Sequence, residues 1–202
     1  MAEDAPRGTG HVCLGWLRGL SAVLAAAEAR IGADPVALEA GLDALIAEFR
    51  RAGRDGARVW WVANGGSASL ASHISQDLVM RCGLSSSVIT DPALMTCAAN
   101  DHGYGQVYAR PLAVHLRAGD LLIAVSSSGN SENIVAACDL ALARRARLVA
   151  LSAFGRDNRL NAFPAAVSLY LPTRNYGHAE IGHESLLHSV IDALAPGPEA
   201  GG

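Results

Sequence analysis

Two short segments rich in glycine and serine have the residue types that hold phosphate groups. The first is Asn-Gly-Gly-Ser-Ala at 64–68, and the second is Ser-Ser-Ser-Gly-Asn-Ser at 126–131. Glycine lets the backbone approach an anion closely, and the unpaired N–H groups of a helix N-terminus point towards it. The pattern predicts a site for a phosphate monoester. The hydroxyls available to it belong to Ser67, Ser126, Ser127, Ser128 and Ser131.

Two helical segments carry histidines and carboxylates at a spacing that brings them together. His73 and Asp77 are four residues apart and share one helix face. The last helical segment aligns three more residues at the same spacing, namely Glu180, Glu184 and His188. Such sets bind a metal ion or carry general acid–base chemistry. The pair of His73 and Asp77 alone is also typical of a solvated helix face, whereas the set on the last helical segment favours a metal-binding or catalytic site. A third polar segment, at 100–105, contains Asp101, which could cap a helix or hold a substrate hydroxyl.

The elements that must position these residues alternate along the chain. Apolar runs, predicted to be five strands, lie at 59–63, 86–90, 121–126, 148–153 and 167–172. Predicted helices lie at 67–81, 93–99, 104–116, 131–145 and 179–193. Apolar strands alternating with helices indicate a doubly wound α/β domain with a parallel sheet covered on both faces. In such a sheet, ligands bind at the carboxyl ends of the strands, where both glycine–serine segments lie.

The N-terminal region predicts a helical pair. One helix covers about 11–31, and the second covers 35–51, with Asp34-Pro35 at its start. The whole of 11–194 is predicted to be one domain that includes this pair. The segments 1–10 and 195–202 have no periodicity and are predicted to be disordered tails.

The composition excludes several classes of function. All 16 basic residues are arginine, so enzymes that need a lysine amine, and Walker A nucleotide sites, are excluded. The net charge of −3 does not indicate binding to nucleic acid or to a membrane surface. The four cysteines lack metal-site spacing, and the polar N-terminus lacks the apolar core of a signal peptide. We therefore expect a cytoplasmic protein with free thiols and no membrane partner.

Taken in order, the polar segments resemble the SIS (sugar isomerase) domain family, and within it the phosphoheptose isomerase group. The resemblance runs from about residue 10 to 194. The segments that carry it are NGGSA at 64–68, His73 and Asp77, Asn100-Asp101 with GYGQVYAR after His102, SSSGNSENI at 126–134, and Glu180, His183 and His188.

The resemblance implies a three-layer αβα sandwich with a flavodoxin-like, five-stranded parallel sheet. It implies a homotetramer in which the N-terminal helices form a bundle between subunits and the sites lie at subunit interfaces. The implied reaction converts sedoheptulose 7-phosphate to D-glycero-D-manno-heptose 7-phosphate by proton transfer through an enediol. The implied cofactor is one zinc ion per subunit.

Roles follow from the resemblance residue by residue. The serines at 126, 127, 128 and 131 would hold the phosphate. The sugar would be lined by Asn64, Gly65, Gly66, Ser67, Asn100, Asp101 and Glu180. The zinc ligands would be His73, Asp77, Glu180 and His188, and Asp77 with His188 would form the acid–base pair. The family usually has Glu at the position of Asp77 and Gln at that of Glu180, and these departures leave the exact substrate open.

Two other kinds of function remain open at this point. One is a non-catalytic SIS protein that binds phosphosugars or partner proteins, such as a replication initiator. The presence of His188, together with Asp77 as a competent base, favours an enzyme over this alternative. The other is a six-carbon phosphosugar isomerase or an amino-sugar phosphate lyase, which the short single-domain chain disfavours.

Overall fold

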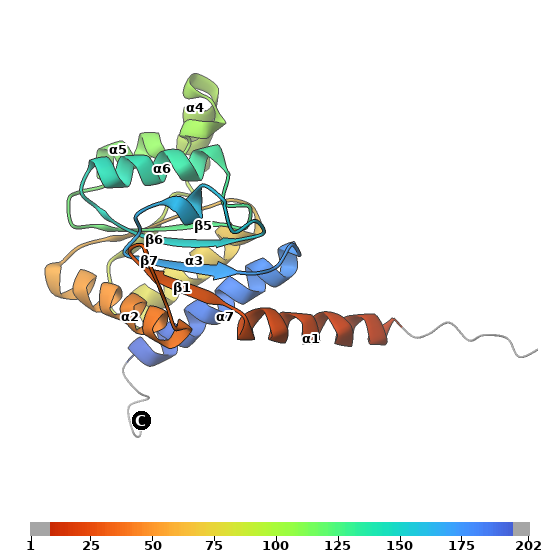
Figure 1. Cartoon of the computed structure of the whole chain (residues 1–202). Coiled ribbons are helices and arrows are strands. Elements are labelled where there is room, and N and C mark those ends of the chain that lie inside the picture. The colour runs from red at the N-terminus through yellow and green to blue at the C-terminus, as the bar shows by residue number, and fades with distance from the viewer. Residues whose placement is uncertain (1–8, 196–202) are drawn as a thin grey trace, which may run out of the picture.

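The middle layer of the protein is a seven-stranded sheet (Figure 1). The structure, a computed structural model, describes residues 9–195. The strands lie in the order β2-β1-β7-β6-β5-β3-β4. Five of them are parallel, as expected: β3 (Val59–Ala63), β4 (Ser86–Val88), β5 (Leu121–Ser126), β6 (Arg147–Ala153) and β7 (Val167–Leu171). Strands β3, β5 and β7 are buried along their whole length, which is why their sequences are mostly apolar.

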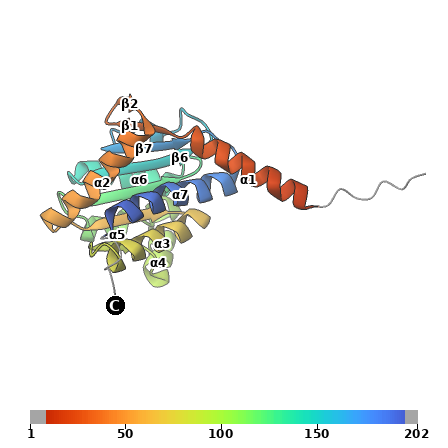
Figure 2. The ribbon, with the colours of Figure 1, turned by 90° about the horizontal axis from the view of Figure 1, so that it is seen from below.

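Helices cover both faces of the sheet and form the outer layers (Figures 1 and 2). One layer contains α2 (Leu38–Asp55), α3 (Gly66–Met80) and α7 (Tyr176–Leu194). The other contains α4 (Pro92–His102), α5 (Ala109–His115) and α6 (Glu132–Ala143), with short 3-10 turns at Tyr104–Gln106 and Leu160–Ala162. Alternate residues of β3 enter the two cores: Trp61 packs with the α2–α3–α7 layer, and Trp60 and Val62 pack with the α5–α6 layer. The predicted three-layer α/β class is therefore confirmed.

The N-terminal region corrects two predictions. The first helix, α1 (Gly10–Ala25), ends six residues before the predicted end at Ile31. The chain then forms a hairpin of β1 (Glu28–Ile31) and β2 (Asp34–Val36), so the sheet has seven strands and not five. Asp34-Pro35 lies in β2 and does not begin a helix. The second helix of the pair is α2.

Pairing across the sheet explains why this segment is not helical. β1 pairs antiparallel with β7, so Ala29 lies opposite Leu169. Ala29 is buried against α2, at a point where a Cβ on Gly41 would come within 2.3 Å of the Ala29 side chain. The turn between the strands places Gly32 at a φ of 60°, a left-handed conformation that glycine adopts without strain. Long-range pairing thus overrides the local preference of an alanine-rich segment for helix.

Helix α1 projects away from the rest of the protein (Figures 1 and 2). None of its 16 residues is buried. Val12, Leu14 and Leu17 are large apolar side chains that are exposed by 72%, 54% and 54%. The Trp16 ring contacts the His178 ring of α7, and His178 Nε2 donates a hydrogen bond to the Trp16 carbonyl at 3.0 Å. Of the predicted tails, 1–8 and 196–202 lie outside the described residues, and Gly10 already belongs to α1.

Candidate active site

The order of the strands creates one crevice at the carboxyl edge of the sheet. From β3 the chain continues to β4 on one side, and β5 then pairs with β3 on the other side. Where successive strands are added on opposite sides of one strand, the loops that follow the two neighbouring strands leave in opposite directions, and ligands bind in the crevice between these loops. The loop after β3 begins at Asn64 and the loop after β5 follows Ser126. The two glycine–serine segments therefore meet at this point.

A cavity of about 270 Å³ lies between the two loops. Its walls are formed by Asn64, Gly65, Gly66, Ser67, Val125, Ser126, Ser127, Ser128, Ser131, Tyr176 and Glu180. Nine of these are residues that the sequence analysis assigned to substrate binding. Val125 and Tyr176 are additions; Tyr176 begins α7 and its ring packs edge-on against Phe154 at 4.8 Å.

The second loop, residues 126–131, which we call the serine loop, is shaped by hydrogen bonds between its own groups. Ser126 Oγ accepts from the Gly129 backbone N–H at 3.1 Å and lies 3.3 Å from Ser131 Oγ. Gly129 has a φ of 66°, and a Cβ there would come within 1.9 Å of Asn158 Oδ1. The conformation therefore requires glycine. Ser131 precedes α6 without capping it through its side chain, so its hydroxyl is free to face a ligand.

A pair of amides braces the first loop against α6. Asn64 Nδ2 donates to Asn133 Oδ1 at 2.9 Å, and Asn133 Nδ2 donates to Asn64 Oδ1 at 2.8 Å. The Tyr104 hydroxyl also donates to Asn64 Oδ1, at 3.2 Å. Asn133, which is 2% exposed, was not among the predicted site residues; its signal in the sequence was an amide on the first turn of a mostly apolar helix. The Tyr108 hydroxyl donates to the Ala63 carbonyl, and burial raises the pKa of Tyr108 to about 12.

Glu180 lies over the start of α3. A Cβ on Gly66 would come within 2.5 Å of the Glu180 carboxylate, so only glycine allows this approach. The N-terminus of a helix carries partial positive charge, which stabilises a carboxylate there. The same helix end faces the cavity through Gly66 and Ser67. Glu180 is therefore placed beside any phosphosugar that occupies the cavity.

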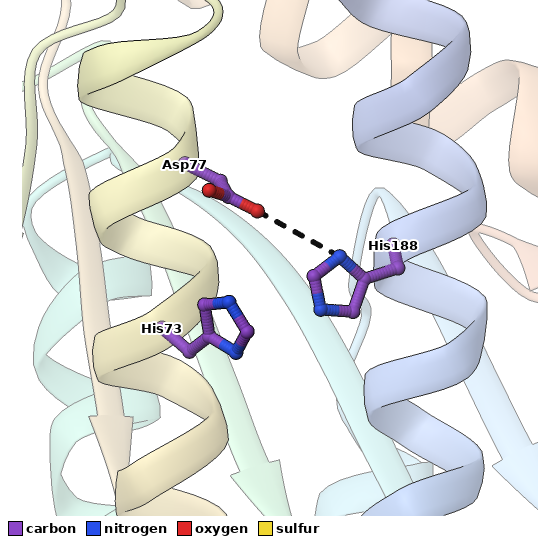
Figure 3. A group of neighbouring side chains, drawn as sticks. All are labelled: His73, Asp77 and His188. Carbon is purple, nitrogen blue, oxygen red and sulfur yellow. Dashed lines mark ion pairs between the residues drawn. The ribbon is translucent and has the colours of Figure 1, made fainter.

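Farther along the same two helices lies a cluster of two imidazoles and a carboxylate (Figure 3). His73 and Asp77 come from α3 and His188 from α7, and one ligand atom of each lies within 4.8 Å of the others. Asp77 Oδ2 is 3.7 Å from His188 Nδ1, and the rings of His73 and His188 meet edge-on at 4.8 Å. Asp77 is 7% exposed and also faces Arg81, whose Nη1 is 3.5 Å from Asp77 Oδ2.

Glu184, and not Glu180, is the second carboxylate at this cluster. His73 Nδ1 is 3.1 Å from Glu184 Oε1, and His188 Nε2 is 4.0 Å from the same oxygen. The predicted zinc ligand Glu180 is absent from the cluster found among the described residues. It lies eight residues before His188, which corresponds to about 12 Å along a helix. The signal for Glu184 was its spacing of four residues from His188.

The donor set suits zinc. Two imidazole nitrogens and one carboxylate oxygen, with an open position for water or substrate, are typical of catalytic zinc sites. Ligand atoms bound to one zinc ion lie about 3.4 Å apart, given bonds of about 2.1 Å. The ligand atoms of His73, Asp77 and His188 lie within 4.8 Å of one another. Small side-chain rotations would therefore bring them to one ion.

Asn100 and Asp101 do not line the cavity. The sequence predicted a loop there, but α4 continues to His102, and both residues are exposed on it. Asn100 Nδ2 donates to Asp101 Oδ1 at 2.8 Å, so the two side chains pair with each other. The hydrogen bonds of Asp101 to Asn100 and to Cys97 lower the pKa of its carboxyl.

His183 is buried between α7 and the sheet. The ring is fully buried, and its Nε2 donates to the Ser152 carbonyl at 3.1 Å. Its Nδ1 has no hydrogen-bond partner among residues 9–195. Burial lowers the pKa of His183 from 6.5 to about 4, so the ring is neutral at physiological pH. Of the two histidines on this stretch of α7, His188 alone is open to the cluster.

Comparisons with known proteins agree with this geometry. A family model described as "SIS domain" matches residues 26–153. A phosphoheptose isomerase from Geobacter sp. (strain M21) is 30% identical over 156 residues, which cover 74% of this chain and 79% of that protein. The phosphoheptose isomerase of Edwardsiella ictaluri (strain 93-146) is 32% identical over 171 residues, or 80% of this chain and 84% of that protein.

The fold is shared with solved structures of the same group. The structure of a phosphoheptose isomerase from Neisseria gonorrhoeae superposes with a TM-score of 0.80 and covers 93% of this chain and 99% of that one, at 22% identity. At 22% identity, the structural similarity shows only that the fold is shared. The family is assigned from the family model and from the relatives that are at least 30% identical. The chain belongs to the SIS-domain family and, within it, to the phosphoheptose isomerase group.

Proposed function

We propose that the protein is an isomerase that interconverts sedoheptulose 7-phosphate and D-glycero-D-manno-heptose 7-phosphate. One observation carries this proposal. The loops after β3 and β5 form a cavity walled by serine hydroxyls and helix N-termini, and two of the helices at this cavity, α3 and α7, also carry an imidazole–carboxylate cluster. The sequence matches to phosphoheptose isomerases support the same reaction.

The serine loop would bind the phosphate. Its four hydroxyls are neutral donors, and the first N–H groups of α3 and α6 add the favourable end of a helix dipole. A chain with no lysine can hold a phosphate in this way or through arginine, and no arginine among residues 9–195 lines the cavity. Binding at the phosphate end positions the reacting carbons at the other end of the sugar.

The isomerisation needs one proton moved between carbons and one between oxygens. In the direction from ketose to aldose, a base removes a proton from C1, and the electrons form the C1–C2 double bond of a cis-enediol. The same base then delivers the proton to C2. We assign this base to Asp77. His188, 3.7 Å from Asp77, would give its free ring N–H proton to O2 as the enediol forms and take the proton of the O1 hydroxyl in return. Zinc, held by His73, Asp77 and His188, would polarise the substrate carbonyl when bound.

The distance between cavity and cluster suggests that each active site is built by two subunits. Asp77 lies eleven residues after Gly66 on α3, or about 16 Å along the helix. An extended seven-carbon sugar with its phosphate spans about 10 Å, from carbon–carbon bonds of about 1.5 Å. We therefore propose that the cavity of one subunit works with the cluster of another. A shared site requires at least a dimer, and the exposed apolar residues of α1 support the homotetramer that the family resemblance implies.

Complementation between two inactive variants tests both the reaction and the shared site. The first variant is Asp77→Asn, and the second is the double variant Ser126→Ala/Ser128→Ala. Each is expected to form no aldoheptose 7-phosphate from sedoheptulose 7-phosphate, followed by NMR. Co-expressed with different tags and purified as mixed oligomers, they should regain part of the activity, because some sites combine an intact cavity with an intact cluster.

The controls separate the two conclusions. Mixed oligomers that remain inactive, while native mass spectrometry shows both chains, would refute the shared site. A wild-type enzyme that forms no product when loaded with zinc would refute the isomerase. Loss of product on chelation, and its return with zinc, is expected if the cluster binds the metal.

A cytoplasmic location is also part of the proposal. All four cysteines are free in the structure, as expected for a reducing compartment. Within residues 9–195, no helix combines the length and apolar character needed to cross a bilayer.

A further inference from the structure

A second cavity, of about 530 Å³, lies beside the N-terminal hairpin and outside the candidate active site. Its polar lining consists of Glu28, Arg30, Arg156, Asn161, Ser168 and Tyr170, and we call it the hairpin cavity. The rest of its wall includes the apolar segment 35–38. The volume is within the range of about 300–1,000 Å³ that small-molecule sites occupy.

The floor of the hairpin cavity holds a buried hydroxyl without a partner. Ser168 lies opposite Arg30 where β7 pairs with β1, so both side chains project from the same face of the sheet. Its neighbours Val167 and Leu169 point into the core on the other face. Ser168 is 3% exposed, and its Oγ forms no hydrogen bond among the described residues. Because buried polar groups are almost always satisfied, this hydroxyl has room for a partner that the described residues do not supply, which a water molecule or a ligand in the cavity would provide.

The charges around this hydroxyl favour an anion. Arg30 donates to the carbonyl and to Oδ1 of Asn161, the latter at 3.0 Å. Arg156 pairs with Glu28 and lies 5.6 Å above the ring of Tyr170. Two guanidinium groups and one carboxylate leave a net positive charge in the cavity. The pair between Arg156 and Glu28 is largely exposed, at 69% and 35%, so a stronger anion can displace Glu28.

We propose that the hairpin cavity binds a small organic phosphate monoester, and that this binding strengthens the hold of the serine loop on its own phosphate. The phosphate would contact Arg30, Arg156 and the Ser168 hydroxyl, since guanidinium groups bind phosphate oxygens in a bidentate fashion. The organic part would lie against the Tyr170 ring and the apolar segment 35–38. The binding half of the proposal is independent of the proposed function, whereas the coupling half rests on it.

A short segment joins the hairpin cavity to the serine loop. Asn161 lines the cavity, and its backbone N–H donates to Asn158 Oδ1 at 2.8 Å. The Asn158 side chain is the group packed against Gly129, at the turn of the serine loop. The backbone N–H of Leu160 donates to the Gly129 carbonyl at 2.8 Å. A ligand that fixes Asn161 therefore restricts the residues that support the serine loop, and a rigid loop loses less entropy when it binds phosphate.

Calorimetric titration with phenyl phosphate tests the binding. The wild-type protein is expected to bind two molecules per chain, one in each cavity. The double variant Ser126→Ala/Ser128→Ala should keep the hairpin site and lose most binding at the serine loop. Arg30→Gln should weaken the hairpin site by at least about tenfold, because it removes a charge-assisted contact. Arg51→Gln is the matched control, since Arg51 is exposed on α2 and pairs only with Asp55 among the described residues.

The outcomes separate the alternatives. An Arg30→Gln titration indistinguishable from that of Arg51→Gln would overturn the site. Benzoate binding as tightly as phenyl phosphate to the serine-loop variant would overturn the assignment to phosphate. If Arg30→Gln fails to fold, judged by circular dichroism, Ser168→Ala takes its place with the same expectation.

The coupling is tested by the affinity of the serine loop with and without a working hairpin site. The Kd of the serine loop for phenyl phosphate should be about fivefold higher in Arg30→Gln than in the wild type, and unchanged in Arg51→Gln. An unchanged Kd of the serine loop in Arg30→Gln would overturn the coupling. These titrations measure binding and not turnover, so an inactive enzyme with two phosphate sites would refute the proposed function and leave the hairpin site standing.

Discussion

We expect His183 to make the free energy of unfolding fall as the pH drops from 6.5 towards 4. The ring is fully buried, and its Nδ1 has no partner among the described residues. Protonation in the folded state would place a charge there without compensation. In the unfolded chain the imidazole keeps its ordinary pKa of 6.5, whereas burial lowers the folded-state pKa of His183 to about 4.

The sign and size follow from the two pKa values. Between pH 6.5 and pH 4 the unfolded state binds a proton that the folded state does not, so acid favours unfolding. The stability is fully present above pH 6.5 and is lost as the pH falls through this window. The full loss is about 3 kcal/mol, and about 2 kcal/mol of it is lost by about pH 5.

Urea unfolding at about pH 7 and about pH 5 measures this loss. The wild type should lose about 2 kcal/mol more between the two pH values than His183→Gln, whose amide does not titrate in this range. His102→Gln, which changes an exposed histidine on α4, should behave as the wild type does. Chelator is present throughout and the protein concentration is fixed, since metal binding and assembly also shift stability. If wild type and His183→Gln lose stability in parallel, the reasoning is refuted.

Three further substitutions have specific expected results. In a kinetic assay, Asp77→Asn should lower kcat by at least about a hundredfold and leave the affinity for a phosphosugar unchanged. Asp192→Asn is the control and should be nearly neutral, because Asp192 is exposed and pairs with the same Arg81 as Asp77 does. Gly129→Ala should weaken phosphosugar binding by about tenfold or more, because the turn of the serine loop needs a positive φ and has no room for a Cβ. A normal affinity, measured by calorimetry, would contradict this. Asn133→Ala should destabilise the protein by about 1–3 kcal/mol and raise KM, because it leaves Asn64 without its amide partner; an unchanged melting temperature would show that the pair is not structural.

The phosphate side of the site was predictable because it depends on short-range patterns. The strands at 59–63 and 121–126 have the predicted bounds, residue for residue. A buried parallel strand is apolar throughout, and the glycine and serine residues after it mark where the chain turns. Once both strands belong to one parallel sheet, their carboxyl ends lie on one edge. Of the nine predicted residues that line the cavity, eight lie at the end of β3 or β5 or in the loop and helix start that follow it. The ninth, Glu180, lies near the start of α7.

Features that depend on long-range contacts were not predictable. The segment 28–31 directly follows three alanines and continues the helical pattern of 11–27, and only pairing with β7 makes it a strand. Asn133 and Glu184 take part in the site because of partners 69 and 111 residues away, Asn64 and His73. Local sequence does not contain these partners. The continuation of α4 to His102 was also not predicted; it places Asp101 on the surface of the chain, and the contact of Asp101 with the substrate stays a prediction.

The pairing of β1 with β7 has a consequence for folding on the ribosome. Ala29 and Leu169, which face each other in the finished sheet, are 140 residues apart. At a synthesis rate of roughly 5–20 residues per second, about 7–28 seconds pass between the synthesis of β1 and that of its partner strand. During that time β1 can pair with β2 and pack against α2, but it has no contact with the rest of the sheet. A nascent chain interrupted after β6 therefore lacks the strand through which the hairpin joins the sheet.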